Sequence, residues 1–235
     1  MIKKKMNGKE CLLGILISLA LFMILFVTSF EIGTYGDWDF YQTEYEKYSV
    51  ADELYMEMDD IMDVTKYMMS YLRGNEEELV VITEVEGREQ DFFNEQDRFH
   101  MGEVRDLFVG GLWLRKIAVV ILIAACVGLF VMKSDWRAFL PKVYRRTLAV
   151  LGVMIGVLGI LIAQNFSKVF VVFHHIFFDN DQWLFDPATD YMIRMLPEGF
   201  FYDIVIRIGS IFIGVLILSL IVSIVISKTY KKNEI

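Results

Sequence analysis

Residues 11–30 read CLLGILISLALFMILFVTSF, an apolar run without a single charged side chain. A helix of about 20 apolar residues is long enough to cross a hydrocarbon core of about 30 Å. The run therefore predicts a membrane-spanning helix. It follows a lysine-rich start, as a signal peptide does, but its length and the lack of a small-x-small cleavage site after it favour an uncleaved helix.

Three further apolar runs follow, in residues 112–132, 147–163 and 204–227. Apolar residues make up 55% of the chain, and this share is typical of an integral membrane protein. The third run is the shortest, and an extension through the apolar residues 169–173 stays open if Gln164, Asn165 and Lys168 face protein or snorkel. The sequence predicts a mainly α membrane protein with four transmembrane helices.

Lysines and arginines indicate how these helices are oriented. They cluster in residues 1–10, 133–146 and 228–235, and these three segments share one side of the membrane if the chain crosses it four times. Cytoplasmic segments carry an excess of Lys and Arg. We therefore expect both termini in the cytoplasm of a multi-pass protein of the cell membrane, with residues 31–111 and 164–203 at the extracellular face.

The first outer segment is strongly acidic. Residues 31–110 hold 22 of the 31 acidic residues against six basic ones, so the net charge of -8 belongs to this segment. Such a surface repels a phosphate backbone. We therefore expect no nucleic-acid partner.

The outer segment of residues 31–111 is expected to be mixed in structure. Apolar residues recur every three or four positions between residues 41 and 73, which predicts an amphipathic helix or two. The methionine-rich face of this helix packs on its neighbours, lies on lipid or holds a variable acyl chain. Residues 79–85 are rich in β-branched side chains and Glu86-Gly87 offers a turn, so a short β-hairpin is expected. A helix beginning near Asn94 then continues into the second span.

All three histidines flank the second and third apolar runs on the outer side. His100 and Glu103 lie on one face of a helix, so the carboxylate can accept the ring N–H of His100 and raise its basicity. His174 and His175 are adjacent and point about 100° apart, so only one of them is expected to face His100. The alternatives are solvated interfacial side chains or structural histidines.

Other chemistries have little support in the sequence. No G-x-S-x-G elbow is present, and Cys11 and Cys126 both fall in apolar runs, so no acyl-enzyme on Ser or Cys is expected. The histidine spacing matches no zinc motif, and Asp179 and Asp181 have no third carboxylate for a cation site. We expect neither a metal nor a cofactor.

Four motifs, taken in order, resemble a known family. They read HMGEVRDLF in residues 100–108, FHHIFF in 173–178, WLFDPATD in 183–190 and LPEGFF in 196–201. With one span before them and a basic link between the second and third spans, this order resembles the lipoprotein intramolecular transacylase family of Gram-positive bacteria. The resemblance covers nearly the whole chain.

The resemblance implies an activity and a site. Members of the family move an acyl chain from the sn-2 ester of a diacylglyceryl group to the α-amino group of the same lipoprotein, which gives the lyso form. The two functional histidines of the family carry over to His100 and His174, while His175 stands at a variable position. Glu103, Arg105, His175 and Trp183 would support these histidines or contact substrate. Diacylglyceryl-modified lipoproteins and membrane phospholipid are the implied partners, and we expect a monomer.

Two readings from other classes stay open on the sequence alone. One is a non-catalytic adaptor that binds lipoproteins, or an envelope sensor, with the acidic outer segment as its contact surface. The other is a b-type haem protein with two histidine ligands, which needs two imidazoles facing one cavity.

Overall fold

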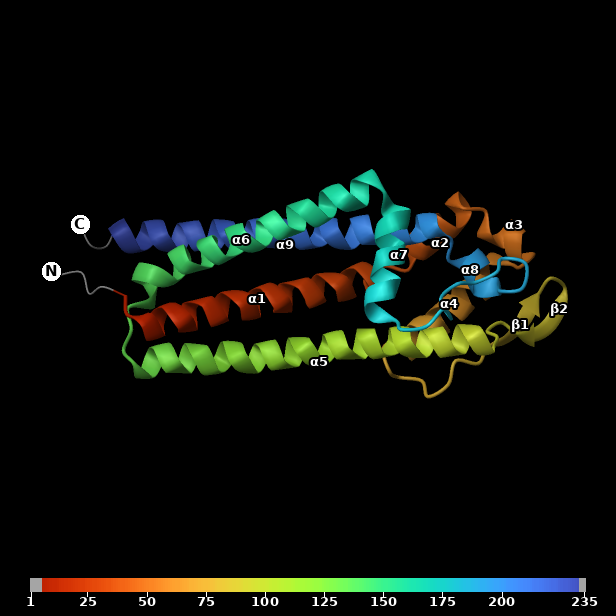
Figure 1. Cartoon of the computed structure of the whole chain (residues 1–235), viewed down its shortest axis with the longest axis horizontal. Helices are drawn as coiled ribbons and strands as arrows, with labels where there is room; N and C mark the ends of the chain where they lie inside the picture. The colour runs from red at the N-terminus through yellow and green to blue at the C-terminus, as the bar shows by residue number, and fades with distance from the viewer. Residues whose placement is uncertain (1–5, 233–235) are drawn as a thin grey trace. The chain divides into compact units, whose positions relative to one another are not determined.

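The computed structural model describes residues 6–232, so the parts of the expected cytoplasmic ends that fall on residues 1–5 and 233–235 lie outside the described residues. Nine helices and two strands lie in the described part, in this order: α1 Gly8–Tyr35, α2 Asp39–Lys47, α3 Val50–Leu54, α4 Met58–Leu72, β1 Ile82–Val85, β2 Arg88–Asp91, α5 Glu95–Val131, α6 Trp136–Gln164, α7 Phe166–Phe177, α8 Tyr191–Met195 and α9 Glu198–Lys232 (Figure 1).

The chain divides into two compact units. The helical unit comprises residues 6–30, 112–164 and 209–232 of the described chain, and the mixed unit comprises residues 31–111 and 165–208. Four of the described helices, α1, α5, α6 and α9, are long and apolar enough to cross a membrane. The predicted fold class of four membrane helices with a mixed segment of helices and a hairpin is therefore confirmed.

In the helical unit, α1 packs closely where small residues meet larger ones. A Cβ atom added to Gly14 would lie 3.2 Å from Cγ1 of Val143 on α6, and one added to Gly128 on α5 would lie 3.3 Å from Cδ1 of Leu13. Because lipid tails are as apolar as the side chains, close packing of this kind holds membrane helices together. The buried cluster around these contacts consists of Ile17, Ala125, Leu129, Phe139 and Val143.

The start of α1, the α5–α6 link and the end of α9 lie at one end of the helical unit. Ser134, in the link between α5 and α6, donates a hydrogen bond of 2.8 Å from its hydroxyl to Glu10 at the start of α1. Tyr230, near the end of α9, donates one of 2.5 Å to Asp135 of the same link. The start of α1, the α5–α6 link and the end of α9 therefore meet, as Figure 1 also shows.

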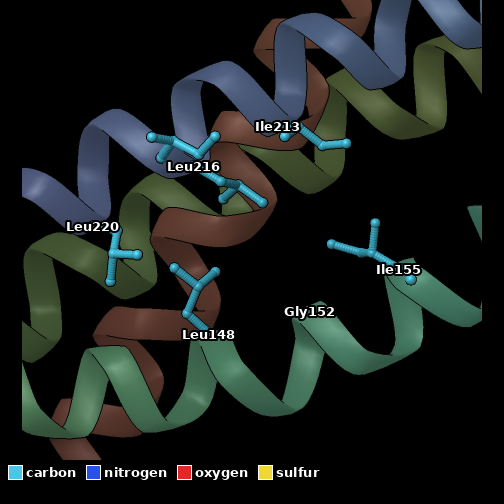
Figure 2. A pocket seen from close by; sticks show the side chains of 8 residues that line it. Leu148, Gly152, Ile155, Ile213, Leu216 and Leu220 are labelled. Atoms are coloured by element: carbon cyan, nitrogen blue, oxygen red, sulfur yellow. The ribbon is translucent and has the colours of Figure 1, made fainter.

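Between α6 and α9 the helical unit has a groove of about 280 Å³ that is lined by apolar residues (Figure 2). Tyr144 of α6 shares a hydrogen bond of 2.5 Å with Ser219 of α9, beside the groove. Farther along α6, Gly152 and Gly156 face open space. The groove is lined by Leu148, Gly152, Ile155, Gly156, Ile213, Leu216, Ile217 and Leu220.

The third apolar run does not continue as one helix through residues 169–173. α6 ends at Gln164, and Asn165 leaves the helical conformation with φ −160° and ψ 87°. The side chain of Asn165 accepts a hydrogen bond of 2.9 Å from the backbone N–H of Lys168, which caps a new helix, α7. This break makes α7 a separate helix of the mixed unit.

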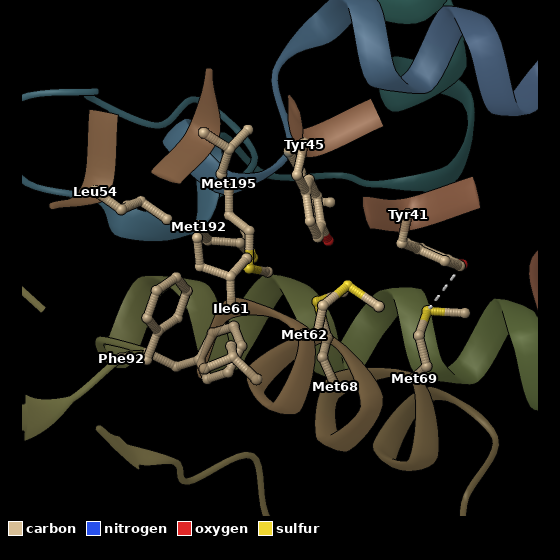
Figure 3. Packing of buried hydrophobic residues seen from close by; sticks show 14 of the residues in the cluster. Tyr41, Tyr45, Leu54, Ile61, Met62, Met68, Met69, Phe92, Met192 and Met195 are labelled. Atoms are coloured by element: carbon tan, nitrogen blue, oxygen red, sulfur yellow. Dashed lines mark hydrogen bonds between the residues drawn. The ribbon is translucent and has the colours of Figure 1, made fainter. Parts of the chain in front are cut away.

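The core of the mixed unit is rich in methionine and tyrosine (Figure 3). The hydroxyl of Tyr45 shares a hydrogen bond of 2.7 Å with that of Thr65, and the hydroxyl of Tyr41 donates one of 2.8 Å to the backbone carbonyl of Thr34. The methionine-rich face of α4 packs into this core, with Met62, Met68 and Met69 buried. Of the three roles considered for that face, the structure shows packing.

The β-hairpin is the one that the sequence predicts. Ile82 pairs with Asp91 and Val85 with Arg88 in an antiparallel register. Glu86 and Gly87 form the turn with φ of 53° and 71°, the two positive values that a tight hairpin turn of type I′ requires.

Candidate functional site

His100 lies near the start of α5, before the part of the helix that a membrane crossing needs. α5 has 37 residues and is therefore about 55 Å long at 1.5 Å per residue, whereas a hydrocarbon core measures about 30 Å. The apolar run of residues 112–132 can supply the crossing. The preceding residues 95–111 carry six charged side chains.

The start of α5 is fixed by a reciprocal cap. The backbone N–H of Asp97 donates to the side-chain oxygen of Asn94, and the backbone N–H of Asn94 donates to the carboxylate of Asp97, both at 2.9 Å. Such a capping box satisfies two backbone donors at a helix start. The side-chain amide of Asn94 also donates to Asp190, and this bond ties the cap to the loop before α8.

His100 is buried among aromatic rings, with 5% of the residue exposed. The ring of Phe178 lies edge-on to the imidazole at 4.8 Å between centroids, and that of Phe185 lies at 5.5 Å. Burial, with His174 as the second cause, lowers the pKa of His100 to about 4. His100 is therefore a neutral imidazole at neutral pH.

His174 lies in the last turn of α7 and is also buried. Its Nδ1 lies 2.7 Å from the backbone carbonyl oxygen of Phe170. Because a carbonyl oxygen only accepts, this bond places the proton on Nδ1 and leaves a lone pair on Nε2. Burial lowers the pKa of His174, and the bond to Phe170 opposes part of that effect. The indole of Trp183 stacks on the imidazole at 4.7 Å.

The imidazoles of His100 and His174 stack on each other, with 5.8 Å between centroids and 27° between planes. His175 points elsewhere, because it is exposed and meets Trp183 edge-on at 5.2 Å. The structure thus brings together one histidine of α5 and one of α7, and leaves the third outside the pair.

Glu103 lies one turn after His100 on the same helix. Its Oε2 is 3.8 Å from Nδ1 of His100, beyond hydrogen-bond length, and both atoms are buried without a hydrogen-bond partner. The other oxygen, Oε1, accepts a hydrogen bond of 2.8 Å from Nδ2 of Asn180. The carboxylate is therefore held on one side and faces the imidazole on the other.

Arg105 makes its contacts away from the two imidazoles. Its Nη1 donates a hydrogen bond of 3.3 Å to the backbone carbonyl of Glu77. Its guanidinium lies 4.7 Å from the centroid of the Tyr71 ring, within the range of a cation–π interaction. Arg105 thus fastens α5 to the end of α4 and to the segment that follows it.

Three residues of the site were not singled out by the sequence. Phe178 and Phe185 surround His100, and Asn180 holds Glu103. The phenylalanines stand inside the motifs FHHIFF and WLFDPATD, so the motif pattern contained a signal for them. Asn180 stands between those motifs, in a polar stretch that resembles an ordinary loop.

The chemistry available here is acid–base chemistry. Within residues 6–232 no group of three or more His, Cys, Asp or Glu side chains is placed to hold a metal ion. Two neutral imidazoles and one carboxylate lie in an aromatic enclosure. Each neutral imidazole can take up a proton at one nitrogen and donate one from the other.

Comparison with solved structures shows the same fold in a known membrane protein. The lipoprotein intramolecular transacylase Lit from Bacillus cereus matches with a TM-score of 0.70 at 23% identity, over 94% of each chain. Two structures of that protein in which a histidine is replaced, one by alanine and one by arginine, match with TM-scores of 0.72 at 22% identity, over 94% of this chain and 94% and 93% of those chains. At these identities the likeness establishes the fold.

Sequence comparison adds a partial relative and a family. A protein of Aquifex aeolicus without an assigned function is 39% identical over 59 residues, which span 25% of this chain and 24% of that protein. A model of the family described as lipoprotein intramolecular transacylase Lit matches residues 15–201. Because this match covers most of the sequence, including the motifs that hold His100 and His174, the chain belongs to the lipoprotein intramolecular transacylase family, whose members are membrane-integral acyltransferases.

Proposed function

We propose that this acyltransferase moves the sn-2 acyl chain of a diacylglyceryl-cysteine lipoprotein to the α-amino group of the same molecule, with His100 and His174 as its catalytic residues. The product is a lyso-form lipoprotein. Family membership supports the reaction. The stacked, buried pair of imidazoles is the observation that supports histidine catalysis.

His174 is suited to take a proton from the attacking amine. An α-ammonium group has a reference pKa of about 8, and it must lose a proton before its nitrogen attacks an ester. The bond between Nδ1 of His174 and Phe170 leaves Nε2 as the acceptor. The lowered pKa of His174 keeps that acceptor unprotonated at neutral pH.

His100, oriented by Glu103, is suited to serve the ester oxygen. The ammonium substrate brings three protons to its nitrogen. One stays on the amide, one reaches the departing glyceryl oxygen through His100, and one leaves through His174. The new C–N bond forms and the C–O bond of the sn-2 ester breaks, so atoms and charge balance without a further reactant. Exchanging the roles of His100 and His174 keeps the same balance of protons and charge.

The intramolecular character of the reaction reduces what the protein must supply. Nucleophile and ester belong to one molecule, so a well-oriented approach replaces an encounter between two molecules, which is worth up to about 7–11 kcal/mol. The rings of Phe178, Phe185 and Trp183 exclude water around the imidazoles. A water-poor site strengthens the electrostatic stabilisation of the oxyanion and suppresses hydrolysis of the ester.

The same proposal includes the orientation of the chain in the cell membrane. The chain crosses the membrane four times, at residues 11–30, 112–132, 147–163 and 204–227. The start of α1, the α5–α6 link and the end of α9 then lie in the cytoplasm. The excess of Lys and Arg in these segments supports this side. The catalytic histidines then act at the extracellular face, on lipoproteins anchored in that leaflet. The protein works as a monomer among membrane phospholipids.

A reconstituted assay tests the function directly. Purified protein in phospholipid vesicles is given a synthetic diacylglyceryl lipopeptide, and tandem mass spectrometry follows the acyl chain from oxygen to nitrogen, a move that changes fragmentation without changing mass. The wild type is expected to convert the lipopeptide, and His174→Ala to lower kcat by about 10²- to 10⁴-fold. Normal conversion by His174→Ala would refute histidine catalysis, while His175→Ala, at the exposed neighbour, is expected to cost far less.

A further inference from the structure

Asn180, in the loop after α7, is the residue that connects this loop with Glu103. Its Nδ2 donates a hydrogen bond of 2.8 Å to Oε1 of Glu103, and its Oδ1 accepts one of 2.9 Å from the backbone N–H of Gln182. Its backbone carbonyl accepts one of 3.0 Å from Nε1 of Trp183. One residue therefore contacts the partners of both imidazoles.

The orientation of the Asn180 amide is fixed by these bonds. The backbone N–H of Gln182 is a donor and needs the amide oxygen, so the amide nitrogen must face Glu103. If the Asn180 amide were flipped, its nitrogen would face the N–H donor of Gln182 and its oxygen would face the Glu103 carboxylate, so neither hydrogen bond could form. Asn180 is thus a donor that cannot turn away without losing two bonds.

We propose that Asn180 is a positioning residue that sets the tautomer of His100 by holding the Glu103 carboxylate against it. With Oε1 engaged by Asn180, Oε2 faces Nδ1 of His100 at 3.8 Å, and both of these buried atoms lack a hydrogen-bond partner. A carboxylate oxygen beside a ring nitrogen favours the proton on that nitrogen. The Nδ1–H form leaves the lone pair on Nε2.

The consequence is that both imidazoles present the same nitrogen in the same state. His174 has its proton on Nδ1 because of the carbonyl of Phe170, and His100 has its proton on Nδ1 because of Glu103 and Asn180. Nε2 of His174 then accepts a proton from the ammonium group, and Nε2 of His100 takes one up from the substrate before it passes that proton to the departing glyceryl oxygen. This role rests on the proposed function, but the tautomer itself is a property of the free protein.

Nitrogen NMR measures the tautomer without substrate. The chain has three histidines, so protein labelled with ¹⁵N-histidine gives only three pairs of ring signals, and the ¹⁵N shift separates a protonated ring nitrogen from a bare one. We expect His100 in the wild type to be mainly Nδ1–H. In Asn180→Asp, which keeps the acceptor for Gln182 but replaces the donor to Glu103 with a second carboxylate, the Nε2–H share is expected to rise.

The kinetic arm uses a polarity swap. Asn180→Asp is expected to lower kcat by roughly 10- to 100-fold, the range seen when a residue that orients a ligating histidine is removed, with KM nearly unchanged. Adding Glu103→Gln restores a donor–acceptor pair in the opposite direction. The double variant is therefore expected to recover kcat above that of either single variant.

Gln96→Ala is the matched control for a loosened loop. The side-chain amide of Gln96 ties α5 to the same loop through the carbonyls of Gln182 and Leu184, each at 3.0 Å, without contacting Glu103. It is expected to lower thermal stability while leaving the His100 tautomer unchanged. The hydrogen bond from the indole N–H of Trp183 to the backbone carbonyl of Asn180 remains in all these variants, so the stack on His174 is kept.

Each outcome decides the inference. The inference is overturned if the His100 tautomer in Asn180→Asp is the same as in the wild type. It is also overturned if the kcat of the double variant is no higher than that of the single variants and Gln96→Ala loses as much kcat as Asn180→Asp. Either result would leave Asn180 a structural residue. A wild type that does not convert the lipopeptide would refute the proposed function, and the NMR comparison would still decide the role of Asn180.

Discussion

The two adjacent histidines of α7 differ in surroundings far more than in sequence. His174 is 6% exposed, is bonded to its own helix and is stacked on two rings, while His175 is exposed. The difference comes from the 100° step between neighbours on a helix, which turns one side chain inward and the next outward. At this scale a single helical step separates a candidate catalytic residue from a surface residue.

The burial of His100 predicts an unusual pH response. Its pKa of about 4 lies below the ordinary value of 6.5, so the unfolded chain takes up this proton before the folded protein does as pH falls. The stabilisation that neutral His100 gives to the folded state is therefore fully present above pH 6.5 and is lost as the pH falls towards 4. The base form of His100 persists over the same range.

An NMR titration of His100 measures this pKa, and the pH dependence of kcat/KM reports the free enzyme. We expect His100 to titrate well below pH 6 in the folded protein and near 6.5 in urea. A midpoint near 6.5 in the folded protein would contradict the burial seen here.

Single residues were predictable from sequence where a short-range rule applied. The helix step placed His100 and Glu103 on one face, and it restricted His174 and His175 to different directions. Nothing local announced Asn180, because its bond to Glu103 joins residues 77 positions apart. Such contacts depend on how whole elements meet.

At the scale of elements, α7 is the clearest departure from the expected pattern. The apolar residues 169–173 resembled a continuation of the third span, because hydropathy alone does not register a change of direction. The signal for the break was Asn165, a residue type that caps helices. Its side chain accepts from the N–H of Lys168, so capping outweighed apolar continuity.

Close contact between α1 and α9 in the mixed unit predicts a sensitive glycine. A Cβ on Gly33 would lie 2.6 Å from Cγ1 of Ile208, whereas one on Gly110 of α5 would meet nothing within 4 Å. Gly33→Ala is therefore expected to lower stability by about 1–3 kcal/mol through overpacking. Gly110→Ala is expected to be neutral or to add up to about 1 kcal/mol of helix propensity.

Thermal unfolding of both variants in the same detergent compares them with the wild type. The prediction requires Gly33→Ala to melt at a lower temperature than Gly110→Ala. Equal melting temperatures would mean that α1 and α9 have room to separate by a few tenths of an ångström at this point.

At the scale of the whole molecule, charge and hydropathy are separated along the sequence. Four apolar runs made the class of fold predictable, because a bilayer requires about 20 apolar residues per crossing and leaves few alternatives. The packing inside the mixed unit was not predictable in the same way. Its core joins α2, α4 and α8 through the contacts of Thr65 with Tyr45 and Met195, and these contacts follow no periodic pattern.

The expected orientation predicts which positions are reachable from outside an intact cell. Tyr55 is 77% exposed in the mixed unit, and Arg137 is exposed near the α5–α6 link. In a background in which Cys11 and Cys126 are replaced by serine, Tyr55→Cys is expected to react with a membrane-impermeant maleimide on intact cells. Arg137→Cys is expected to react only after permeabilisation, and the reverse pattern would invert the topology.

The bond between His174 and Phe170 has a consequence for how the site is assembled. It spans four residues of one helix, so the proton of this imidazole is placed as soon as α7 has formed, before any distant segment arrives. The Glu103–Asn180 bond closes a loop of 77 residues and must wait for that closure. The His174 half of the site is therefore set by local helix geometry, and the His100 half by later, long-range folding. A partly folded chain already has the proton of His174 in place but lacks an oriented His100.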